Sequence, residues 1–308
     1  FQGIDLSKVS TSMTINAPAT SLFALYIAYA DECGIPRESL RGTVQNDILK
    51  EYIARGLYIF PPKDSMRLTT DLMSWSKLNT PQWNTISVSG YHMREAGCTA
   101  TQEIAFTLSN GLEYLNQAIK AGMEIDDVAP RMSFFFGCHN DFFEEVAKFR
   151  AARQLWHDLV MERYEPTNRK STMLRFHTQT AGVTLTAQQP LNNAVRVSYQ
   201  ALSAVLGGTQ SLHTNSYDEA IGLPTEESAL LALRTQQILA DETNITKSVD
   251  PLAGSYLVEE LTSKLYNNSK LLVEEIEDNG GAMKCVVCLL YTSPSPRDAT
   301  LSRMPSSA

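Results

Sequence analysis

Six segments of the chain alternate polar and apolar residues, and a helical pattern follows each of them. The segments begin near residues 9, 42, 85, 131, 174 and 210. Alternation with a period of two is typical of β-strands, because successive side chains point to opposite faces of a strand. Strands that alternate with helices build a parallel sheet, since each parallel connection needs a crossover. The sequence therefore predicts an α/β fold with a parallel sheet, either open or closed into a barrel.

One face of each predicted strand carries mainly polar residues. Helices cover the outer face of a barrel, so that face must be apolar and the polar face must look into the lumen. An ordinary eight-stranded barrel fills its lumen with bulky Val, Ile and Leu, whereas small polar residues leave space and offer hydrogen bonds. An open doubly wound sheet would instead need apolar residues on both faces. We predict an incomplete (β/α)8 TIM-type barrel with a polar lumen and about six of the eight units. The residues expected to face one concavity are Ser12, Thr14, Thr43, Gln45, Ser87, Ser89, Ser133, His177 and Ser211.

Helix-start signals follow the predicted strands. Asn46 and Asp47 stand at an N-cap position directly after the second strand. Thr99 and Gln102 have the spacing of a capping box, and Thr225 is expected to cap a later helix. The residues expected to face inward from the helix after Thr99 are Ile104, Leu108, Leu112, Leu115 and Ile119.

Composition excludes several classes of protein. The chain has 308 residues, of which 43% are apolar and 19% charged, so it can bury a large core. The net charge of −8 argues against nucleic acid as the main partner, and no apolar run approaches the length that spans a bilayer. Five widely spaced cysteines do not form a disulfide framework, so we expect a reducing compartment. Because the first residue is Phe1, we expect a piece of a longer chain.

Three stretches carry a resemblance to a known family. They are GTVQNDILKEYIAR at residues 42–55, SGYHMREAG at residues 89–97 and GGTQSLHTNSYDEA at residues 207–220. With them, the chain from about Ile4 to Val286 resembles the methylmalonyl-CoA mutase family, in its large catalytic subunit. The resemblance implies radical isomerisation of methylmalonyl-CoA and succinyl-CoA, with adenosylcobalamin as cofactor. It also implies a barrel whose axis holds the pantetheine arm of coenzyme A, which agrees with the polar lumen.

The resemblance implies that parts of the enzyme lie outside this sequence. The family's first two strands, with arginines that hold the coenzyme A phosphates, would precede Phe1, and no histidine here has the D-x-H-x-x-G context of a cobalamin-binding domain. We expect a partial acyl-CoA-binding barrel in residues 1–256, a post-barrel helical segment in residues 257–286 and an unrelated, disordered tail in residues 287–308. Cys285 and Cys288 lack a second pair of ligands, so we expect no metal site. This chain alone should be inactive. The expected partners are an acyl-CoA, a cobalamin domain or subunit, and a second copy in a dimer.

The resemblance also assigns roles to individual residues. His92 would hydrogen-bond the migrating thioester carbonyl, and Arg55 would clamp the free carboxylate of the substrate. Gln45 would orient the acyl-CoA head. The other expected substrate contacts are Ser12, Thr14, Thr43, Asn84, Arg131, Ser133, Lys170, His177, Gln179, Gln210 and Ser211. Asn215 and Glu219 would lie near the adenosyl ribose, whereas Arg94 departs from the glutamine expected at its position.

Several alternatives remain open from the sequence. His92 alone would be interpreted as a strand-end histidine bonded to backbone, and Arg55 as a solvated arginine that offsets a helix dipole. An ethylmalonyl-CoA mutase is an alternative function. An isobutyryl-CoA mutase is another, although that branch replaces the arginine found here at Arg55. A non-catalytic acyl-CoA-binding paralogue would usually lose residues like His92 and Gln45. The expected compartment is the bacterial cytoplasm, or the mitochondrial matrix in a eukaryote.

Overall fold

A row of parallel strands forms the inner layer of the protein. The computed structural model describes residues 1–287. The strands are β1 (Ser10–Met13), β2 (Arg41–Val44), β3 (Trp83–Asn84), β4 (Ile86–Ser89), β5 (Met132–Cys138), β6 (Phe176–Thr180) and β7 (Ser211–His213). Strands β3 and β4 are one stretch interrupted at Thr85. Near this break, the amide of Ser87 donates to the carbonyl of Gln45 at 2.8 Å and joins the two sheets. The six predicted strands are therefore confirmed, the third of them in two pieces.

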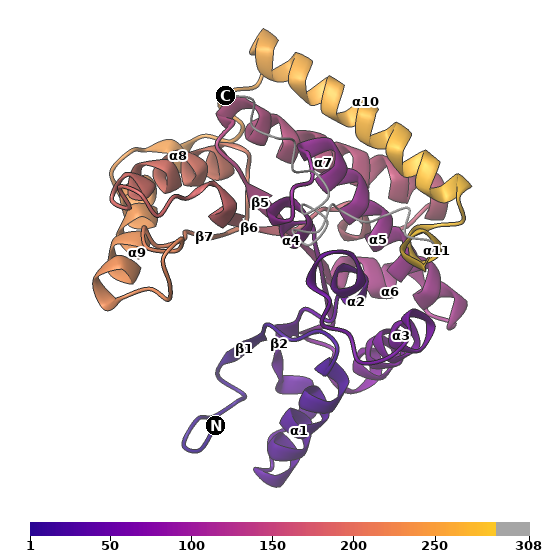
Figure 1. Cartoon of the computed structure of the whole chain (residues 1–308). Helices are drawn as coiled ribbons and strands as arrows, with labels where there is room; N and C mark the ends of the chain where they lie inside the picture. The colour runs from indigo at the N-terminus through magenta and orange to yellow at the C-terminus, as the bar shows by residue number, and fades with distance from the viewer. Residues whose placement is uncertain (288–308) are drawn as a thin grey trace, which may run out of the picture.

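The strands curve around one concave side but do not close into a full barrel. Their order is β1-β2-β3 followed by β4-β5-β6-β7, and every pairing is parallel. Within residues 1–287, β1 pairs only with β2, and β7 only with β6. Figure 1 shows these two strands at opposite ends of the row. The predicted incomplete α/β barrel, with two unpaired edges, is confirmed.

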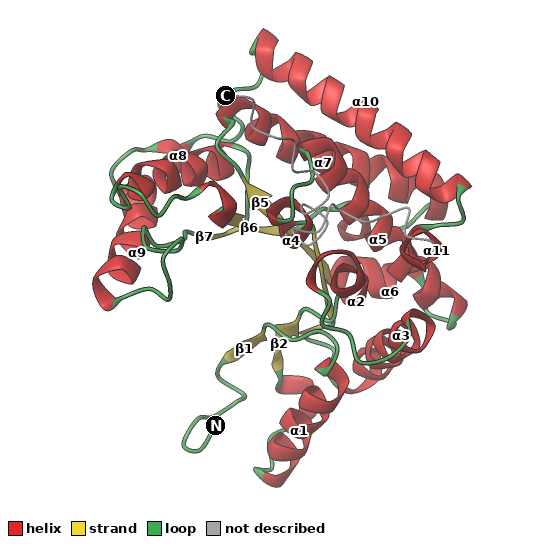
Figure 2. Ribbon diagram, in the orientation of Figure 1, coloured by secondary structure: helices red, strands yellow, loops and turns green. Residues whose placement is uncertain are grey.

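Helices follow the strands and cover their outer face (Figure 2). They are α1 (Ala19–Glu32), α2 (Ile48–Lys50), α3 (Pro62–Asn79), α4 (Tyr91–Glu95), α5 (Ala100–Lys120), α6 (Ile125–Val128), α7 (Phe142–Tyr164), α8 (Asn192–Leu206), α9 (Glu226–Asp241), α10 (Tyr256–Asp278) and α11 (Ala282–Val287). Short 3-10 turns include η3 (Ala129–Arg131), η4 (Arg169–Thr172) and η5 (Gly182–Thr184), and a π-helical turn, η2 (Glu51–Arg55), continues α2. Helix α10 packs across α5 and α7 as a further outer layer.

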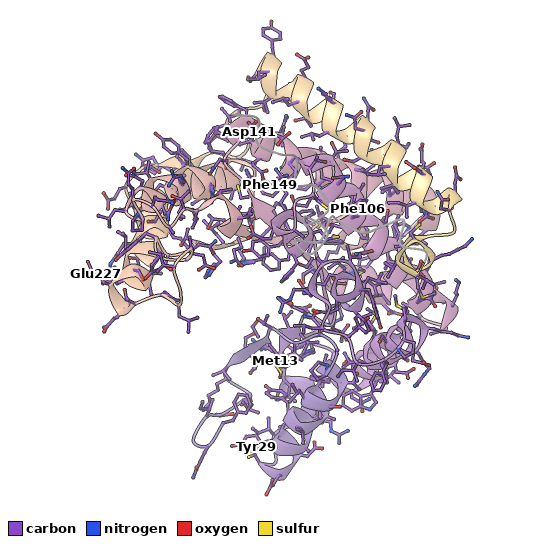
Figure 3. The ribbon with its side chains drawn as sticks, viewed as in Figure 1. Met13, Tyr29, Phe106, Asp141, Phe149 and Glu227 are labelled. Atoms are coloured by element: carbon purple, nitrogen blue, oxygen red, sulfur yellow. The ribbon has the colours of Figure 1, made fainter. Side chains whose placement is uncertain are left out.

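The apolar face of the strands packs against these helices. Ile86 and Val88 are at most 1% exposed. Figure 3 labels Phe149 of α7. Its ring contacts Phe136 and Phe176 of the sheet, with ring centroids 6.3 and 5.1 Å apart. The large core therefore lies between sheet and helices, as the alternation predicts, and the opposite face of the strands is left for polar residues.

Two of the predicted helix starts form as expected, but one predicted core residue is wrong. Thr99 Oγ1 accepts from the Gln102 amide at 3.2 Å while Gln102 Oε1 accepts from the Thr99 amide at 3.0 Å, which completes the capping box. Thr225 likewise accepts from the Ser228 amide and caps α9. Ile119 is 37% exposed rather than buried. The last turn of α5 runs past the packed layer, where the neighbouring residues are exposed as well.

The end of the chain is described only to Val287. Helix α11 includes Cys285, which is buried. The predicted tail, apart from its first residue, lies outside the described residues, as does Cys288.

Candidate active site

A cavity of about 650 Å³ lies on the concave side of the strands. Eight of the nine residues predicted to face a concavity line it. Ser89 is the exception, because it is fully buried and its hydroxyl turns to His92. Further lining residues expected as site residues are Asn84, His92, Gln179 and Gln210. Lining residues that sequence reasoning did not select include Phe135, Arg175 and His213. The alternation places these three on the same strand faces as the selected residues, so the sequence pattern could have identified them as lining residues.

Five expected site residues lie outside the cavity lining. Arg131 in η3 and Lys170 in η4 precede β5 and β6, so they lie at the amino ends of the strands. Arg55 ends the π-helical turn, Asn215 follows β7, and Glu219 lies shortly after it. Arg55, Lys170 and Glu219 are exposed, whereas Asn215 is buried. Because the strands are parallel, Arg131 and Lys170 lie at one end of the lumen. The other three residues follow strands and lie at the opposite end.

His92 lies in the first turn of α4, directly after β4. Its Nδ1 is 2.8 Å from the hydroxyl of Ser89. The backbone amide of Ser89 donates to the Asp47 carboxylate at 2.7 Å, so the residue that holds the imidazole is itself anchored. Burial, and then the charges of Lys50 and Arg55, lower the pKa of His92 to about 3. The imidazole is therefore neutral at physiological pH, and its second nitrogen remains for a hydrogen bond.

A second histidine joins the two last strands within the lumen. Nδ1 of His177 on β6 is 2.8 Å from the hydroxyl of Ser211 on β7. Burial and the nearby His213 lower the pKa of His177 to about 4. Both histidines expected in the site are thus neutral hydrogen-bonding groups.

A buried polar group underlies the end of β2. The Tyr114 hydroxyl donates to Asp47 Oδ1 at 2.7 Å and accepts from the Leu49 amide at 2.9 Å. Burial raises the pKa of Asp47, while the charge of Lys50 opposes this shift. Lys50 Nζ donates to Gln45 Oε1 at 2.6 Å. Asp47 is the predicted cap of α2, where it also accepts from the Lys50 amide, but its contacts to Ser89 and Tyr114 were not foreseen.

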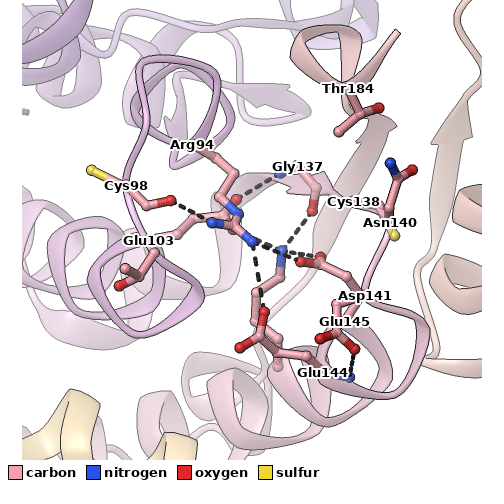
Figure 4. A network of polar contacts seen from close by, with 12 residues as sticks. Arg94, Cys98, Glu103, Gly137, Cys138, Asn140, Asp141, Glu144, Glu145 and Thr184 are labelled. Carbon is pink, nitrogen blue, oxygen red and sulfur yellow. Dashed lines mark hydrogen bonds and ion pairs between the residues drawn. The ribbon is translucent and has the colours of Figure 1, made fainter. Parts of the chain in front are cut away.

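Arg94 belongs to a buried charge cluster behind α4 (Figure 4). Its Nη2 is 3.3 Å from Glu145 Oε1, and its Nη1 donates to the carbonyl of Cys98. Lys148 Nζ donates to Glu103 Oε2 at 2.7 Å, to Glu145 Oε2 and to a backbone carbonyl of β5. The other oxygen of Glu103 accepts from a β5 amide at 2.7 Å. The cluster therefore ties α4, α5 and α7 to the central strand. Both terminal nitrogens of the arginine that departs from the resemblance are engaged, whereas its Nε has no hydrogen-bond partner among the described residues.

Glu95 ends α4 near the carboxyl end of the lumen. Its Oε2 accepts from the Val183 amide at 3.0 Å, while its Oε1 is buried with no hydrogen-bond partner among the described residues. Burial raises the pKa of Glu95 to about 7. Glu219 and Asn215 lie close by, since both approach Gly182 beside this carboxylate.

We expect Glu95→Gln to change how stability depends on pH. Because the folded pKa of about 7 exceeds the usual 4.5, the folded protein holds this proton between these values, and wild-type stability falls as the pH rises through that window. Glutamine does not titrate. The free energy of unfolding of the variant, relative to that of the wild type, should therefore be about 1–2 kcal/mol higher at pH 8 than at pH 5. This range is discounted for the partial exposure of Glu95. Urea unfolding at both pH values measures this, with the exposed Glu260→Gln as control. An equal difference at both pH values would contradict it.

The described residues hold no candidate metal-ligand group, membrane-spanning helix or disulfide. Within residues 1–287, no group of three or more His, Cys, Asp or Glu side chains could hold a metal ion. Every helix in this range is too short or too polar to cross a bilayer. The four cysteines described, Cys33, Cys98, Cys138 and Cys285, form no disulfide.

Comparison with known proteins identifies the family. The family model described as methylmalonyl-CoA mutase matches residues 1–290. The chain is 52% identical over 286 residues to the methylmalonyl-CoA mutase of Cereibacter sphaeroides and 50% identical to that of Escherichia coli, covering 93% of this chain and 40% of each relative. It is 49% identical to the mitochondrial methylmalonyl-CoA mutase of Homo sapiens, of which it covers 38%. The chain thus spans about 40% of the length of the curated relatives it matches, and it belongs to the methylmalonyl-CoA mutase family.

Proposed function

We propose that this chain is the substrate-binding barrel of an adenosylcobalamin-dependent isomerase that interconverts methylmalonyl-CoA and succinyl-CoA. The observation that carries the proposal is the neutral imidazole of His92, held by Ser89 beside Gln45 on the wall of a polar lumen. The polar wall supplies donors and acceptors to the acyl and pantetheine groups of a thin acyl-CoA. A cavity of about 650 Å³ is large enough for its acyl and pantetheine groups, and small Ser and Thr side chains on the strand faces leave space in it.

His92 supplies a hydrogen bond to the thioester carbonyl in this proposal. Its Nδ1 is engaged by Ser89, and its other ring nitrogen, which forms no hydrogen bond with the described residues, can donate to a ligand oxygen. A neutral donor in a partly buried site stabilises negative charge that develops on oxygen, and it does so without losing a proton. The ring packs edge-on against Phe135 at 5.8 Å, and Phe135 stacks on Tyr91 at 4.9 Å. These aromatic rings fix the imidazole and exclude water from one side.

Arg55 binds the free carboxylate of the substrate in this proposal. Within residues 1–287 its guanidinium forms no hydrogen bond and no ion pair, yet its charge lowers the pKa of His92, so it lies near that end of the lumen. An arginine fork without a partner suits a carboxylate that arrives with the ligand. The other proposed contacts with the acyl-CoA are Ser12, Thr14, Thr43, Gln45, Asn84, Arg131, Ser133, Lys170, His177, Gln179, Gln210 and Ser211.

A cobalamin-type cofactor is implied by the family, and we propose adenosylcobalamin. When bound, this cofactor supplies radical chemistry through its cobalt–carbon bond. The residues near Glu95 fit an adenosyl group, because the buried Oε1 of Glu95 has no hydrogen-bond partner in the described range and can accept from a hydroxyl or amine. Asn215 and Glu219 are the proposed ribose contacts. Asn215 is already well held, since its side-chain amide bonds Thr180 and Gln179 at 2.8 Å.

The partners and the compartment follow from the same proposal. The cobalamin domain would be a further part of the protein or a separate subunit, and the parent enzyme would be a dimer. The compartment would be bacterial cytoplasm or mitochondrial matrix, where cysteines such as the four described here stay reduced. An ethylmalonyl-CoA mutase shares the substrate carboxylate and stays the second candidate, since Arg55 suits both substrates.

A chimera tests the proposed function. Residues 1–286 of this chain would replace the matching segment of the Escherichia coli relative, because the two are 50% identical there. With adenosylcobalamin added, the chimera is expected to convert methylmalonyl-CoA into succinyl-CoA. His92→Ala should lower kcat by about 10²–10³ in the same chimera, the typical cost of removing one donor to a developing oxyanion. The 308-residue chain alone should give no turnover. A chimera that folds and binds the cofactor but has no mutase activity would refute the proposal.

A further inference from the structure

Lys50 is a fully buried cation directly beneath the wall of the lumen. Its side chain is 0% exposed, and Nζ lies 2.6 Å from Oε1 of Gln45, which lines the cavity. Burial lowers the pKa of Lys50, while the charges of Asp47 and Glu51 oppose this shift. A buried lysine is costly unless its charge is compensated. Among the described residues, the only hydrogen-bond acceptor of its ammonium group is an uncharged amide that faces the site.

This contact decides which half of the Gln45 amide faces the lumen. An ammonium group has three donors and no acceptor, so the atom that meets it must be the oxygen of the carboxamide. A second donor agrees with this orientation. Asn16 Oδ1 accepts from the Asp47 amide at 3.2 Å, which turns Asn16 Nδ2 toward the same Gln45 oxygen at 3.4 Å. The NH2 group of Gln45 forms no hydrogen bond within residues 1–287 and is left for the cavity.

We infer that Lys50 is a positioning residue that locks the Gln45 carboxamide so that its NH2 group points into the lumen and selects a ligand with an acceptor oxygen. The inference rests on the proposed function only for the identity of this ligand, whose carboxylate or thioester carbonyl is such an acceptor. A free glutamine could rotate by half a turn and present its oxygen, which would repel the same ligand atom. Lys50 removes this alternative before the ligand arrives, so the donor needs no reorientation on binding.

The alternative role for Lys50 is structural, as a counter-ion for the buried Asp47. That carboxylate already accepts from the Tyr114 hydroxyl and the Ser89 amide, and no ion pair between Lys50 and Asp47 lies within 4 Å in the described residues. A structural lysine would affect folding whatever side chain stands at residue 45. A positioning lysine acts through Gln45 alone, and this difference can be measured.

A double-mutant cycle in the full-length chimera separates the two roles. Lys50→Met keeps the side-chain length without the charge, and Gln45→Met removes the amide. Lys50→Met should lower kcat/KM for methylmalonyl-CoA by about 10- to 100-fold, as expected for loss of a fixed donor to a charged or polarised oxygen. In the Gln45→Met background, the same change should have less than about a twofold effect. Lys63 is exposed, so Lys63→Met is the matched control and should have the kcat/KM of the wild type.

Three results would overturn the inference. The first is a Lys50→Met enzyme within twofold of the wild type, and the second is an equal loss from Lys50→Met in both Gln45 backgrounds. The third comes from Gln45→Glu, which decides the matter if Lys50→Met does not fold. This variant gains an ion pair with Lys50 and should fold, but it presents an acceptor to the lumen and should lose at least as much activity as Gln45→Met. Retained activity would show that no donor is needed there. Failure of the proposed function is recognised separately, by absence of turnover in the unmutated chimera.

Discussion

Replacement of Arg55 by glutamine is expected to lower kcat/KM for methylmalonyl-CoA by about 30- to 160-fold in the chimera. Arginine offers two parallel charged donors to a carboxylate, whereas glutamine offers at most one comparable donor and no charge. Loss of one partner from a buried charge pair costs roughly 2–5 kcal/mol, and we take the lower part, about 2–3 kcal/mol, because Arg55 is exposed in the ligand-free protein. Steady-state kinetics with purified chimera measure the effect.

A substrate without the carboxylate provides the control for Arg55. The same replacement should lower kcat/KM for isobutyryl-CoA by less than about threefold, or raise it. This substrate has no carboxylate, so the wild-type complex leaves the arginine unpaired and the variant does not. Arg67→Gln is the matched surface variant, since Arg67 is exposed and, within residues 1–287, pairs only with Asp71 along α3. Equal losses on both substrates would mean that Arg55 supports general affinity or folding, and its assignment to the carboxylate would be withdrawn.

Replacement of Lys148 by methionine is expected to lower the free energy of unfolding by about 3–5 kcal/mol. Burial opposes its charge, but Glu103 and Glu145 raise the pKa of Lys148, so it is charged at neutral pH. Without it, both carboxylates remain buried, and Arg94 is the only other cation paired with both of them in the described part of the chain. Urea unfolding of the 308-residue chain, followed by circular dichroism, measures the loss.

Two further variants test whether charge causes the loss at Lys148. Lys77→Met breaks a half-exposed pair with Asp127 and should cost less than about 1 kcal/mol. Glu145→Gln added to Lys148→Met removes one of the two buried carboxylates that have lost their lysine partner, and it should restore part of the stability. If the double variant is no more stable than Lys148→Met, lost packing rather than uncompensated charge explains the effect.

The fold and the lining of the lumen were predictable because they follow from a local rule. A strand turns alternate side chains to opposite faces, so Ser12, Thr43 and Ser133 could be assigned to the lumen from their positions alone. The same rule failed for Ser89, the last residue of β4. There the chain turns into α4, and a hydrogen bond to His92 decides where the hydroxyl points.

The contacts that hold the site in place could not be predicted in the same way. Lys50 looks like any lysine in the first turn of a helix, and only the folded chain buries it against Gln45. Arg94 and Glu145 are 51 residues apart, and no local pattern pairs them. The π-helical turn after Lys50 was also unforeseen, because its residues have ordinary helical spacing. Long-range pairing of charges depends on the packing of helices, which periodicity does not specify.

Helix α4 has five residues, too few to be stable as an isolated helix. It carries His92 on one side toward the lumen and Arg94 on the other into the charge cluster behind it. The position of the imidazole therefore depends on the charge cluster behind α4 as well as on Ser89. Selection on the chemistry of such a site extends to residues outside it, so an inherited change at Glu103 or Glu145 can impair the lumen while every residue that lines it is intact.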